Sequence, residues 1–598
     1  MGNQAADRLR RLREEMERHG VDLYVIPTSD FHGSEYVGEH FKTREYVTGF
    51  TGSAGTAVVL KEEAGLWTDG RYFIQAKAQL DGSGVTLYRM EEEGVPSVKE
   101  FIEEKLRPGG CLGFDGRTVS AKEGEAYRRI AEEKKASLCT KEDLVGNIWE
   151  GRPPVPKEPF FILEEAYSGC GTKEKLSAVR QKMKEAKADA HILASLYDIA
   201  WLLNVRGGDI SHVPVVLSFL VITEQECIWF VREQSITEAQ RAYLEENHVS
   251  TMPYGEIYSY VSSMRSKAVL YDEKSVNFRI LKSLADSVKK IKRENPSGLL
   301  KAVKNPVEIE NTIAAHIKDG VAFTKFMFWL KTNIGKIPMT EISASDYLEK
   351  QRRAQENFLD LSFDTICAYG ANAAMMHYAA TPESNARLEP EGFLLVDSGG
   401  HYLEGTTDIT RTIALGLVSE EMRKHFTAVL RANLNLSAAK FLYGCSGLNL
   451  DILAREPLWE MGIDYKCGTG HGVGHILNVH EGPNSFRWKQ REDGEDLAVL
   501  EEGMVTTDEP GVYIEGAYGI RIENELVCRR AEKNEYGQFM CFETITYAPV
   551  DLDAVDADGM TGRERELLNR YHKKVYETLS PYLDEEENDW LKEYTRAI

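Results

Sequence analysis

Two stretches of this chain repeat each other at an offset of 167 residues, and this repeat restricts the fold more than any other feature. Each copy has an apolar helical face followed by a short apolar strand, "VDLYVI" in the first and "KADAHIL" in the second. A repeat of this length predicts two related α/β domains, because solenoid repeats have periods of about 20 to 50 residues. The matching positions are Leu9, Leu12, Arg13, Met16 and Asp22 with Leu176, Val179, Arg180, Met183 and Asp189.

Segments rich in proline and glycine divide the chain further. Four prolines between Pro153 and Pro159 predict a stiff linker and a boundary near residue 155. A second break, from Asn295 to Pro306, precedes a stretch with the 3.6-residue apolar period of an amphipathic helix. Strands and glycine-rich turns begin near Phe358, and a C-terminal helix follows Pro549. We predict four segments: 1–155, 156–305, 306–550 and 551–598.

Composition excludes several classes of partner and location. A formal charge of −23 argues against steady binding to nucleic acid or to an anionic membrane, since both need a basic surface. Nine cysteines without a C-x-x-C pair fit a reducing compartment. The charged N-terminus lacks the features of a signal peptide, and the apolar run from Val213 to Ile222 is too short to span a bilayer and predicts a buried strand. We expect a cytoplasmic protein.

The stretch "KCGTGHGVGHILNVHEGP", from Lys466 to Pro483, concentrates histidine, cysteine and glycine. On a helix, Cys467, His471 and His475 would share one face as zinc ligands. That helix is disfavoured, because alternate glycines would each cost roughly 0.8–1 kcal/mol relative to alanine. The glycines also lack the spacing of a phosphate-binding fingerprint. The remaining interpretation is a glycine-rich loop that brings its backbone close to another group and presents His471.

Four carboxylates elsewhere occupy comparable positions beside predicted strands or turns: Asp397, Asp408, Glu509 and Glu523. Any one of them alone is more often a solvated turn or cap residue. Together they carry a charge of −4, which two divalent cations would neutralise. Oxygen ligands with one imidazole suit Mn²⁺, Co²⁺ or Zn²⁺ better than a thiolate site would. The pattern therefore favours a site for two metal ions, which could share a hydroxide.

The motifs "VDSGGHYLEGTTDITRT", "GTGHGVG", "NVHEGP", "TDEPG" and "GIRIEN" resemble aminopeptidase P, the Xaa-Pro aminopeptidases of the pita-bread, creatinase-like metallopeptidases. The resemblance covers nearly the whole chain, because "FTGSAG", "WTDGRYFIQA" and "DIAWLLNVRGGDI" are similar to the family's N-terminal domains. It implies an α/β (α+β) fold. Two creatinase-like N-terminal α/β domains are followed by a pita-bread catalytic domain with a short helical C-terminal extension.

The resemblance also implies roles for individual residues. Asp408 and Glu523 are expected to bridge two metal ions, most often Mn²⁺, with Zn²⁺ or Co²⁺ as alternatives. His377 and His480 match histidines that handle the substrate, and Arg71 matches an N-terminal-domain arginine that reaches the peptide. Glu509 is also expected to relay a proton. The complete implied ligand set is Asp397, Asp408, His471, Glu509 and Glu523.

One position departs from the family pattern. The family usually has H-G-T-G-H where this chain has Cys467, so the histidine four residues before the metal ligand is absent. His475 stands at a different position and gives no ground for calling it a replacement. Cys467 therefore leaves the ligand set intact but puts substrate affinity and pH dependence in question.

The activity implied is release of the N-terminal residue from peptides with proline in second position. A prolidase-type dipeptidase, a metal-free creatinase and a non-catalytic pita-bread binding module are the alternatives. A homodimer is also expected, because the C-terminal stripe of Leu567, Tyr571, Val575 and Leu579 would leave apolar surface in water. The alternative is that this stripe packs on its own catalytic domain.

Overall fold

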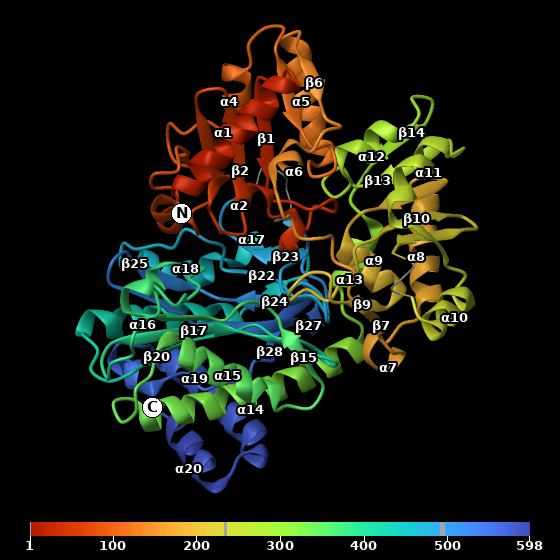
Figure 1. Ribbon diagram of the computed structural model, residues 1–598. Helices are drawn as coiled ribbons and strands as arrows, with labels where there is room; N and C mark the ends of the chain where they lie inside the picture. Colours follow the sequence, from red (N-terminus) through yellow and green to blue (C-terminus); the bar gives the residue numbers. More distant parts are fainter. Residues whose placement is uncertain (1, 233–235, 491–496) are drawn as a thin grey trace. The chain divides into compact units, whose positions relative to one another are not determined.

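The computed structural model describes residues 2–232, 236–490 and 497–598. These residues form two compact units (Figure 1). The first contains the described residues up to Leu163 together with Cys170–Ser297, and the second contains Glu164–Gly169 together with Gly298–Ile598. Both copies of the repeat therefore belong to the first unit.

The first unit contains two six-stranded sheets of the same topology in its described part. Their strand orders are β4-β3-β2-β1-β5-β6 and β12-β11-β10-β8-β13-β14. In each sheet the first strand of the copy pairs antiparallel on one side and parallel on the other. The two related α/β domains predicted from the repeat are confirmed. The strands are β1 Leu23–Pro27, β2 Thr56–Leu60, β3 Ala64–Thr68, β4 Thr86–Arg89, β5 Cys111–Phe114, β6 Ser137–Cys139, β8 Ala190–Leu193, β10 Phe219–Thr223, β11 Cys227–Val231, β12 Ser250–Pro253, β13 Ala268–Tyr271 and β14 Lys289–Lys292, with β7 Phe160–Ile162 and β9 Val205–Gly207 as a separate pair.

The repeated helices cover these sheets with the faces that the sequence predicts. Leu9, Leu12 and Met16 of α1 are buried, as are Leu176 and Val179 of α8. The two copies meet where the Phe278 amide donates to the Val119 carbonyl at 2.8 Å. The helices are α1 Gly2–Arg18, α2 Thr43–Thr48, α3 Phe73–Gln79, α4 Val98–Lys105, α5 Ala121–Glu133, α6 Leu144–Ile148, α8 Thr172–Glu185, α9 Leu196–Leu203, α10 Glu238–Glu246, α11 Ile257–Ser263 and α12 Phe278–Ser283.

The strand predicted from Val213 to Ile222 is shorter than expected: β10 spans only Phe219–Thr223. Pro214 has no amide hydrogen for a sheet ladder. The Asp209 carboxylate accepts the Leu217 amide at 2.8 Å, so this amide is bonded to a side chain and not to a neighbouring strand. The apolar side chains before β10 are nevertheless buried.

The second unit combines several small antiparallel sheets with long helices. In its described part the largest sheet has the order β21-β28-β27-β24-β22-β23, and β16-β17-β20 and β15-β18-β19 form three-stranded sheets. Helices α14 and α15 pack side by side (Figure 1). The helices are α7 Glu165–Ser168, α13 Pro296–Ala302, α14 Pro306–Asn333, α15 Glu341–Arg353, α16 Glu420–Ser437, α17 Gly447–Leu450, α18 Ile452–Trp459, α19 Gly562–Leu579 and α20 Glu585–Tyr594. The strands are β15 Phe358–Leu361, β16 Ile366–Tyr369, β17 Phe393–Ser398, β18 Gly400–Tyr402, β19 Gly405–Thr406, β20 Ile409–Ala414, β21 Lys440–Leu442, β22 Gly470–Gly472, β23 Glu481–Phe486, β24 Val505–Asp508, β25 Gly511–Ile514, β26 Tyr518–Arg521, β27 Asn524–Asn534 and β28 Gly537–Thr544.

Local signals set the start of α14. Asn305 caps the helix, because its side-chain oxygen accepts the amides of Val307 and Glu308, and the Asn305 amide donates to the Glu308 carboxylate. Pro306 occupies the first turn, where its missing amide hydrogen costs nothing. The sequence break predicted to end at Pro306 thus coincides with a helix start.

The segment from Phe393 to Leu415 lies where strands and glycine-rich turns are predicted, and it contains four short strands, β17 to β20. Gly399, between β17 and β18, lets the backbone pass close to Thr407, because a Cβ there would lie 1.8 Å from the Thr407 carbonyl oxygen. The antiparallel pairing of β17 with β20 places Asp397 opposite Thr410. Asp408 precedes β20 by one residue, so two predicted ligands lie at neighbouring strand ends.

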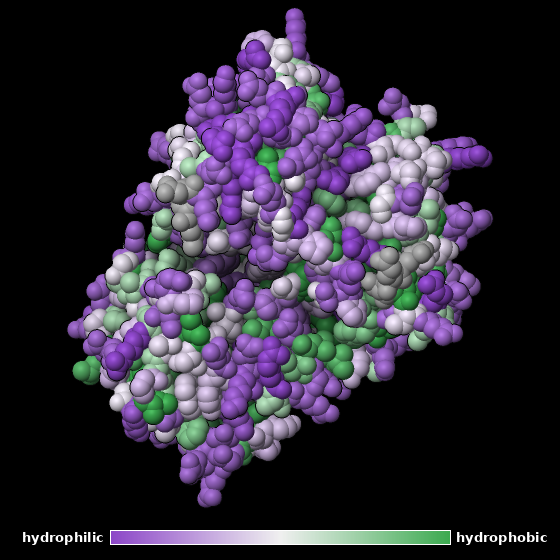
Figure 2. All heavy atoms as spheres, in the orientation of Figure 1, coloured by the Kyte–Doolittle hydropathy of each residue, from purple (hydrophilic) through white to green (hydrophobic). Residues whose placement is uncertain are grey.

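The C-terminal helices pack on the second unit rather than leaving an apolar face in water. Val575, Leu579 and Leu591 are fully buried and pack with Val321 and Tyr547. Of the two possibilities for this stripe, the structure has the one in which it packs within its own chain, because α14 offers it an apolar surface. The face shown in Figure 2 is mostly hydrophilic. No helix in the described ranges combines the length and apolarity needed to cross a membrane.

Candidate metal centre and active site

Short strands and their ends carry all five predicted metal ligands. Asp397 lies on β17, and His471 lies in the middle of β22. Asp408 immediately precedes β20, Glu509 immediately follows β24, and Glu523 lies between β26 and β27. The glycine-rich segment around His471 is therefore a strand and not a helix, as its alternate glycines lead one to expect. Gly470 and Gly472 are required there, because backbone carbonyls lie about where their Cβ atoms would stand, at 1.9 and 2.2 Å.

Three of these side chains converge directly. Potential ligand atoms of Asp408, His471 and Glu523 all lie within 4.8 Å of one another. His471 Nε2 is 3.5 Å from Asp408 Oδ2 and 3.4 Å from Glu509 Oε1. Asp397 adds its charge to the same cluster, since it raises the pKa of both Asp408 and Glu523. The structure thus brings together the residues that the sequence motifs single out.

The carboxylates of this cluster repel one another in the absence of a cation. Burial raises the pKa of Asp408 and of Glu523 well above their usual range, and the neighbouring carboxylates raise both further. Asp397 Oδ1 is buried without a hydrogen-bond partner. A largely buried group of four acids and one imidazole is the donor set that two divalent cations with oxygen and nitrogen ligands would satisfy. The residues therefore fit a dinuclear metal centre.

Arg521 brings a positive charge to this cluster. Its Nη2 donates to Asp397 Oδ2 at 2.5 Å, its Nη1 donates to the Tyr513 hydroxyl at 2.6 Å, and its Nε donates to Thr410 Oγ1 at 3.2 Å. The Thr410 hydroxyl in turn donates to Glu523 Oε2 at 2.7 Å. Arg521 thereby orients two of the predicted ligands, one directly and one through Thr410. Sequence analysis did not identify this role, although Arg521 lies within the quoted motif "GIRIEN".

Glu525 and His316 form a buried pair that holds the backbone of Asp408. Glu525 Oε1 accepts the Asp408 amide at 2.8 Å and lies 3.1 Å from His316 Nε2. His316 Nδ1 lies 2.8 Å from the Thr312 carbonyl. Burial lowers the pKa of His316, but the charge and hydrogen bond of Glu525 outweigh it and raise the pKa overall. Sequence analysis missed both residues: Glu525 directly follows the motif "GIRIEN", and His316 lies on the amphipathic helix predicted after Pro306.

The two predicted substrate histidines differ in what the structure gives. The His480 ring lies 4.3 Å from the His471 ring, centre to centre, at an interplanar angle of 87°. His377 follows a 3₁₀ turn, η4 Gly370–Ala374, which packs against β26. Gly519 on β26 permits this approach, because a Cβ there would lie 1.8 Å from the Ala373 carbonyl oxygen. His480 thus contacts the centre directly, and His377 follows a turn packed on the strand that carries Arg521.

Cys467 and His475 have different surroundings. Burial raises the pKa of the Cys467 thiol to about 11, and the charge of Glu509 adds to this effect. The thiol is therefore neutral at physiological pH and packs against the buried cluster around Phe393. His475 is buried, with Nδ1 3.2 Å from Thr312 Oγ1 and Nε2 3.0 Å from the Tyr167 carbonyl. His475 thus links α14 to α7 and does not take the place of the missing histidine.

Arg71 belongs to the first unit, in the turn between β3 and α3. Its guanidinium makes two hydrogen bonds of 2.8 Å to the Asp69 carboxylate. Burial alone would lower the pKa of Arg71, but the hydrogen bonds and charge of Asp69 raise it overall. Its side chain is 28% exposed, so a charged guanidinium of fixed orientation remains accessible.

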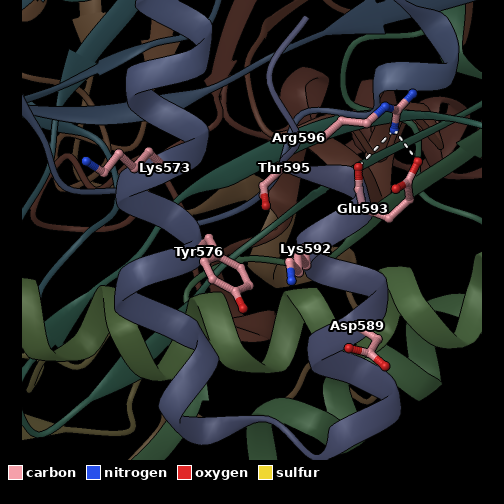
Figure 3. Close-up of a pocket in the computed structure, with 7 residues that line it drawn as sticks. All are labelled: Lys573, Tyr576, Asp589, Lys592, Glu593, Thr595 and Arg596. Atoms are coloured by element: carbon pink, nitrogen blue, oxygen red, sulfur yellow. Dashed lines mark hydrogen bonds and ion pairs between the residues drawn. The ribbon is translucent and has the colours of Figure 1, made fainter.

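Two surface pockets contain none of the predicted site residues. One, of about 480 Å³, lies between α19 and α20 (Figure 3). Arg596 at its edge is already paired with Glu593 at 3.1 Å, and Lys573 points away from α20 in this view. The other, of about 490 Å³, adjoins the start of α14. Neither is a candidate active site.

Two repeated α/β domains and a pita-bread unit with a buried carboxylate and histidine cluster together define a metallopeptidase. Residues 310–530 match metallopeptidase family M24, and residues 8–143 and 151–308 each match a creatinase/prolidase N-terminal domain. Residues 538–598 match the C-terminal region of peptidase M24. The chain belongs to the aminopeptidase P family of M24 metallopeptidases.

Relatives of this family match over nearly their full length. Aminopeptidase P1 of Arabidopsis thaliana is 36% identical over 98% of this chain and 98% of its own. The probable Xaa-Pro aminopeptidase P of Coprinopsis cinerea is 36% identical over 100% of this chain and 99% of its own. The solved X-prolyl aminopeptidase of Caenorhabditis elegans, described as a cytosolic enzyme with a di-nuclear active site, is 32% identical. It covers 99% of this chain and 100% of its own, with a TM-score of 0.94. The resemblance drawn from the sequence motifs is confirmed.

Proposed function

We propose that this protein is an Xaa-Pro aminopeptidase that uses two divalent metal ions to release the first residue of peptides with proline in second position. The observation that carries the proposal is the convergence of Asp408, His471 and Glu523 within 4.8 Å, with Glu509 beside His471. The full-length similarity to X-prolyl aminopeptidases supports the same activity.

Five residues would hold the metal ions: Asp397, Asp408, His471, Glu509 and Glu523. Asp408 and Glu523 are the proposed bridging ligands, since both are deeply buried and close to each other. Mn²⁺ is the proposed ion, and Zn²⁺ and Co²⁺ have compatible ligand preferences. When bound, two such ions would polarise the scissile carbonyl and lower the pKa of a water molecule.

The remaining work falls to side chains of this chain. Glu509, whose side chain is 21% exposed, would accept and pass on a proton at its carboxylate. His480 and His377 would donate hydrogen bonds that stabilise charge on the substrate carbonyl. Arg71 would bind the peptide through its charged guanidinium. Arg71→Ala is therefore expected to raise KM more than it lowers kcat.

The substrate class has a physical reason. An Xaa-Pro bond is a tertiary amide without an amide hydrogen, and the proline ring fixes φ near −65°. A peptidase whose site must accept a hydrogen bond from the amide at this position therefore does not cleave an Xaa-Pro peptide bond. A site specialised for proline in second position is therefore required.

Two alternatives have less support. The Xaa-Pro dipeptidase of Bacillus anthracis is 23% identical and covers 64% of this chain with a TM-score of 0.51, so it shares the fold alone. A prolidase-type activity would also leave the doubled N-terminal module without a counterpart. A non-catalytic binding module would have no need for the complete set of buried acids.

One experiment tests the proposal. Metal analysis would be combined with hydrolysis of an Xaa-Pro-Yaa tripeptide and an Xaa-Pro dipeptide, before and after chelation. We expect about two metal ions per chain, cleavage of the tripeptide, and loss of activity on chelation that Mn²⁺ restores. Activity confined to the dipeptide would indicate a prolidase, and a metal-loaded but inactive protein would indicate a binding module.

Domain limits, assembly and location complete the proposal. We take 1–155, 156–305, 306–550 and 551–598 as its domains, supported by the two repeated sheets and by the matching family segments. We propose a homodimer in the cytoplasm, and the family resemblance and the cytosolic C. elegans enzyme support it. Light scattering of the full-length chain tests the dimer. Deleting 551–598 would not, because that segment supplies part of the core.

A further inference from the structure

Two lysines and one glutamate form a buried charged group that the proposed mechanism leaves unexplained. Lys301 Nζ lies 2.6 Å from Glu481 Oε2, and Lys304 Nζ bonds to Glu481 Oε1. The side chains are 7%, 3% and 4% exposed, in the same order. Each carboxylate oxygen of Glu481 therefore has its own ammonium partner. The group carries a net charge of +1 away from water.

Such a group is costly for a protein that needs only stability. Removing a charge from water costs several kcal/mol, and an apolar replacement of similar volume is often neutral or stabilising. A second lysine on one glutamate adds a buried charge without a second carboxylate. The arrangement is better explained by the need to hold one backbone segment in one place.

The lysines come from a segment that is itself fixed. The Lys304 amide donates to the Gly503 carbonyl at 3.1 Å, and Val303 forms a β-bridge with Met504. Gly503 has φ +93° and no room for a side chain, because a Cβ would lie 2.5 Å from the Lys304 carbonyl oxygen. Asn305, the next residue, caps α14. Both ammonium groups thus project from an anchored backbone.

Glu481 is bonded through the backbone to His480, one of the two proposed substrate histidines. It follows His480 in the chain and begins β23, where it pairs with Gly472 of the strand that carries His471. Glu481 is itself paired within the sheet, so the ion pairs of its carboxylate fix the backbone directly after His480. The His480 carbonyl is held as well, by the Asn478 side-chain amide at 2.8 Å.

The loop that leads to His480 is strained and needs such support. Ile476 is fully buried at φ +51°, a conformation that is a genuine outlier for a β-branched residue. Strain of this kind persists only where the surroundings fix the chain. Thr406 Oγ1 holds the Ile476 amide at 3.0 Å on one side. Glu481 holds the loop on the other.

We propose that Lys301, Lys304 and Glu481 form a clamp that positions His480 against the metal centre. The three are positioning residues, because they act through the backbone of His480 and not on the substrate. The inference rests on the proposed function for its kinetic consequence, but the placement of His480 can be measured independently. Loss of the clamp should impair turnover while leaving the five ligands and their metal ions in place.

The test compares clamp variants with a matched buried pair elsewhere. Glu481→Gln removes the shared carboxylate, Lys304→Met leaves the Lys301 pair, and Lys304→Arg keeps the charge. The control is Lys331→Met, because Lys331 lies 2.6 Å from buried Asp551 and is 8% exposed. For each variant, kcat and KM for an Xaa-Pro-Yaa peptide, metal content and Tm are measured. Diethyl pyrocarbonate labelling of His480, followed by mass spectrometry, reports its placement without relying on catalysis.

We expect Glu481→Gln to lower kcat/KM at least about tenfold with about two metal ions retained, since small displacements of catalytic groups have effects of this size. Lys304→Met should have a smaller effect, and Lys304→Arg should stay within about twofold of wild type. The labelling rate of His480 should change most in Glu481→Gln, less in Lys304→Met and least in Lys304→Arg. Lys331→Met should lower Tm without either change. Unchanged kcat/KM and labelling in a folded Glu481→Gln protein would overturn the clamp. The wild-type protein could also hydrolyse no Xaa-Pro peptide while the clamp variants still change the labelling rate of His480. That result would uphold the clamp and reject the proposed function.

Discussion

Arg521 donates a hydrogen bond of 2.5 Å to Asp397, and their side chains are only 4% and 12% exposed. The same guanidinium reaches Tyr513 and Thr410, so its position is fixed by three partners. A metal ligand held in this way keeps one orientation before the metal arrives. We infer that Arg521 lowers the cost of gathering four acids in one buried site.

Replacing Arg521 should therefore weaken metal binding. Arg521→Lys keeps the charge but cannot reach Asp397, Tyr513 and Thr410 together, because an ammonium lacks the planar fork. We expect metal affinity or kcat to fall about 10- to 100-fold, as for other residues that orient a metal ligand. Titration of the metal-free variant with Mn²⁺ measures the affinity. An unchanged affinity would contradict this role.

Substituting Asp408 or Glu523, the two deeply buried carboxylates, should weaken metal binding but stabilise the metal-free protein. Asp408→Asn and Glu523→Gln are expected to abolish hydrolysis and to reduce bound metal well below two ions per chain. Each also removes one charge from a cluster of like charges. The metal-free variants should therefore melt at a higher temperature than the metal-free wild type. Full activity in either variant would refute the two-metal site.

Cys467 should behave as a packing residue. Its thiol is neutral, with a pKa raised to about 11, and it adjoins the cluster around Phe393. We expect Cys467→Ala to retain both metal ions and to keep kcat/KM within about twofold. Cys467→His inserts a larger ring and should lower Tm, as overpacking does. Metal counts and pH–rate profiles check both variants, and metal loss in Cys467→Ala would mean that the ligand set is wrong.

His475 should matter for stability and not for catalysis. It joins Thr312 on α14 to the Tyr167 carbonyl on α7. His475→Ala leaves buried polar groups without a partner, which costs about 1–3 kcal/mol. Urea unfolding measures this loss, and kcat/KM for an Xaa-Pro-Yaa peptide should stay close to wild type. A large rise in KM would place His475 in the substrate site instead.

His572 should make the protein sensitive to acid. Burial lowers its pKa to about 3, with smaller contributions from Arg411 and Arg596, and its Nε2 accepts the Val550 amide at 3.1 Å. The unfolded chain binds a proton below about pH 6.5 while the fold resists it, so stability is present above that pH and falls toward pH 3. We expect this group to cost up to about 1.4 kcal/mol per pH unit within the window. His572→Gln should show a shallower decline in denaturant unfolding, and an identical pH slope would contradict this prediction.

Local sequence signals account for much of the fold. The repeated helix and strand of each N-terminal domain follow from apolar periodicity. The start of α14 follows from Asn305, Pro306 and Glu308, which lie within four residues of one another. The glycines flanking His471 also predicted, correctly, that no helix forms there. These features depend on neighbours in the chain, and such neighbours are visible in a sequence.

The identities of the candidate ligands came from motifs, but their supports did not. Arg521 meets Asp397 across 124 residues, and Lys301 meets Glu481 across 180. No local pattern distinguishes these side chains from solvated charges. Likewise, the spacing of Val575 and Leu579 shows that one helical face is apolar but not that α14 covers it. Periodicity and capping specify short-range structure, whereas pairing of distant charges and burial of a face depend on how the whole chain packs.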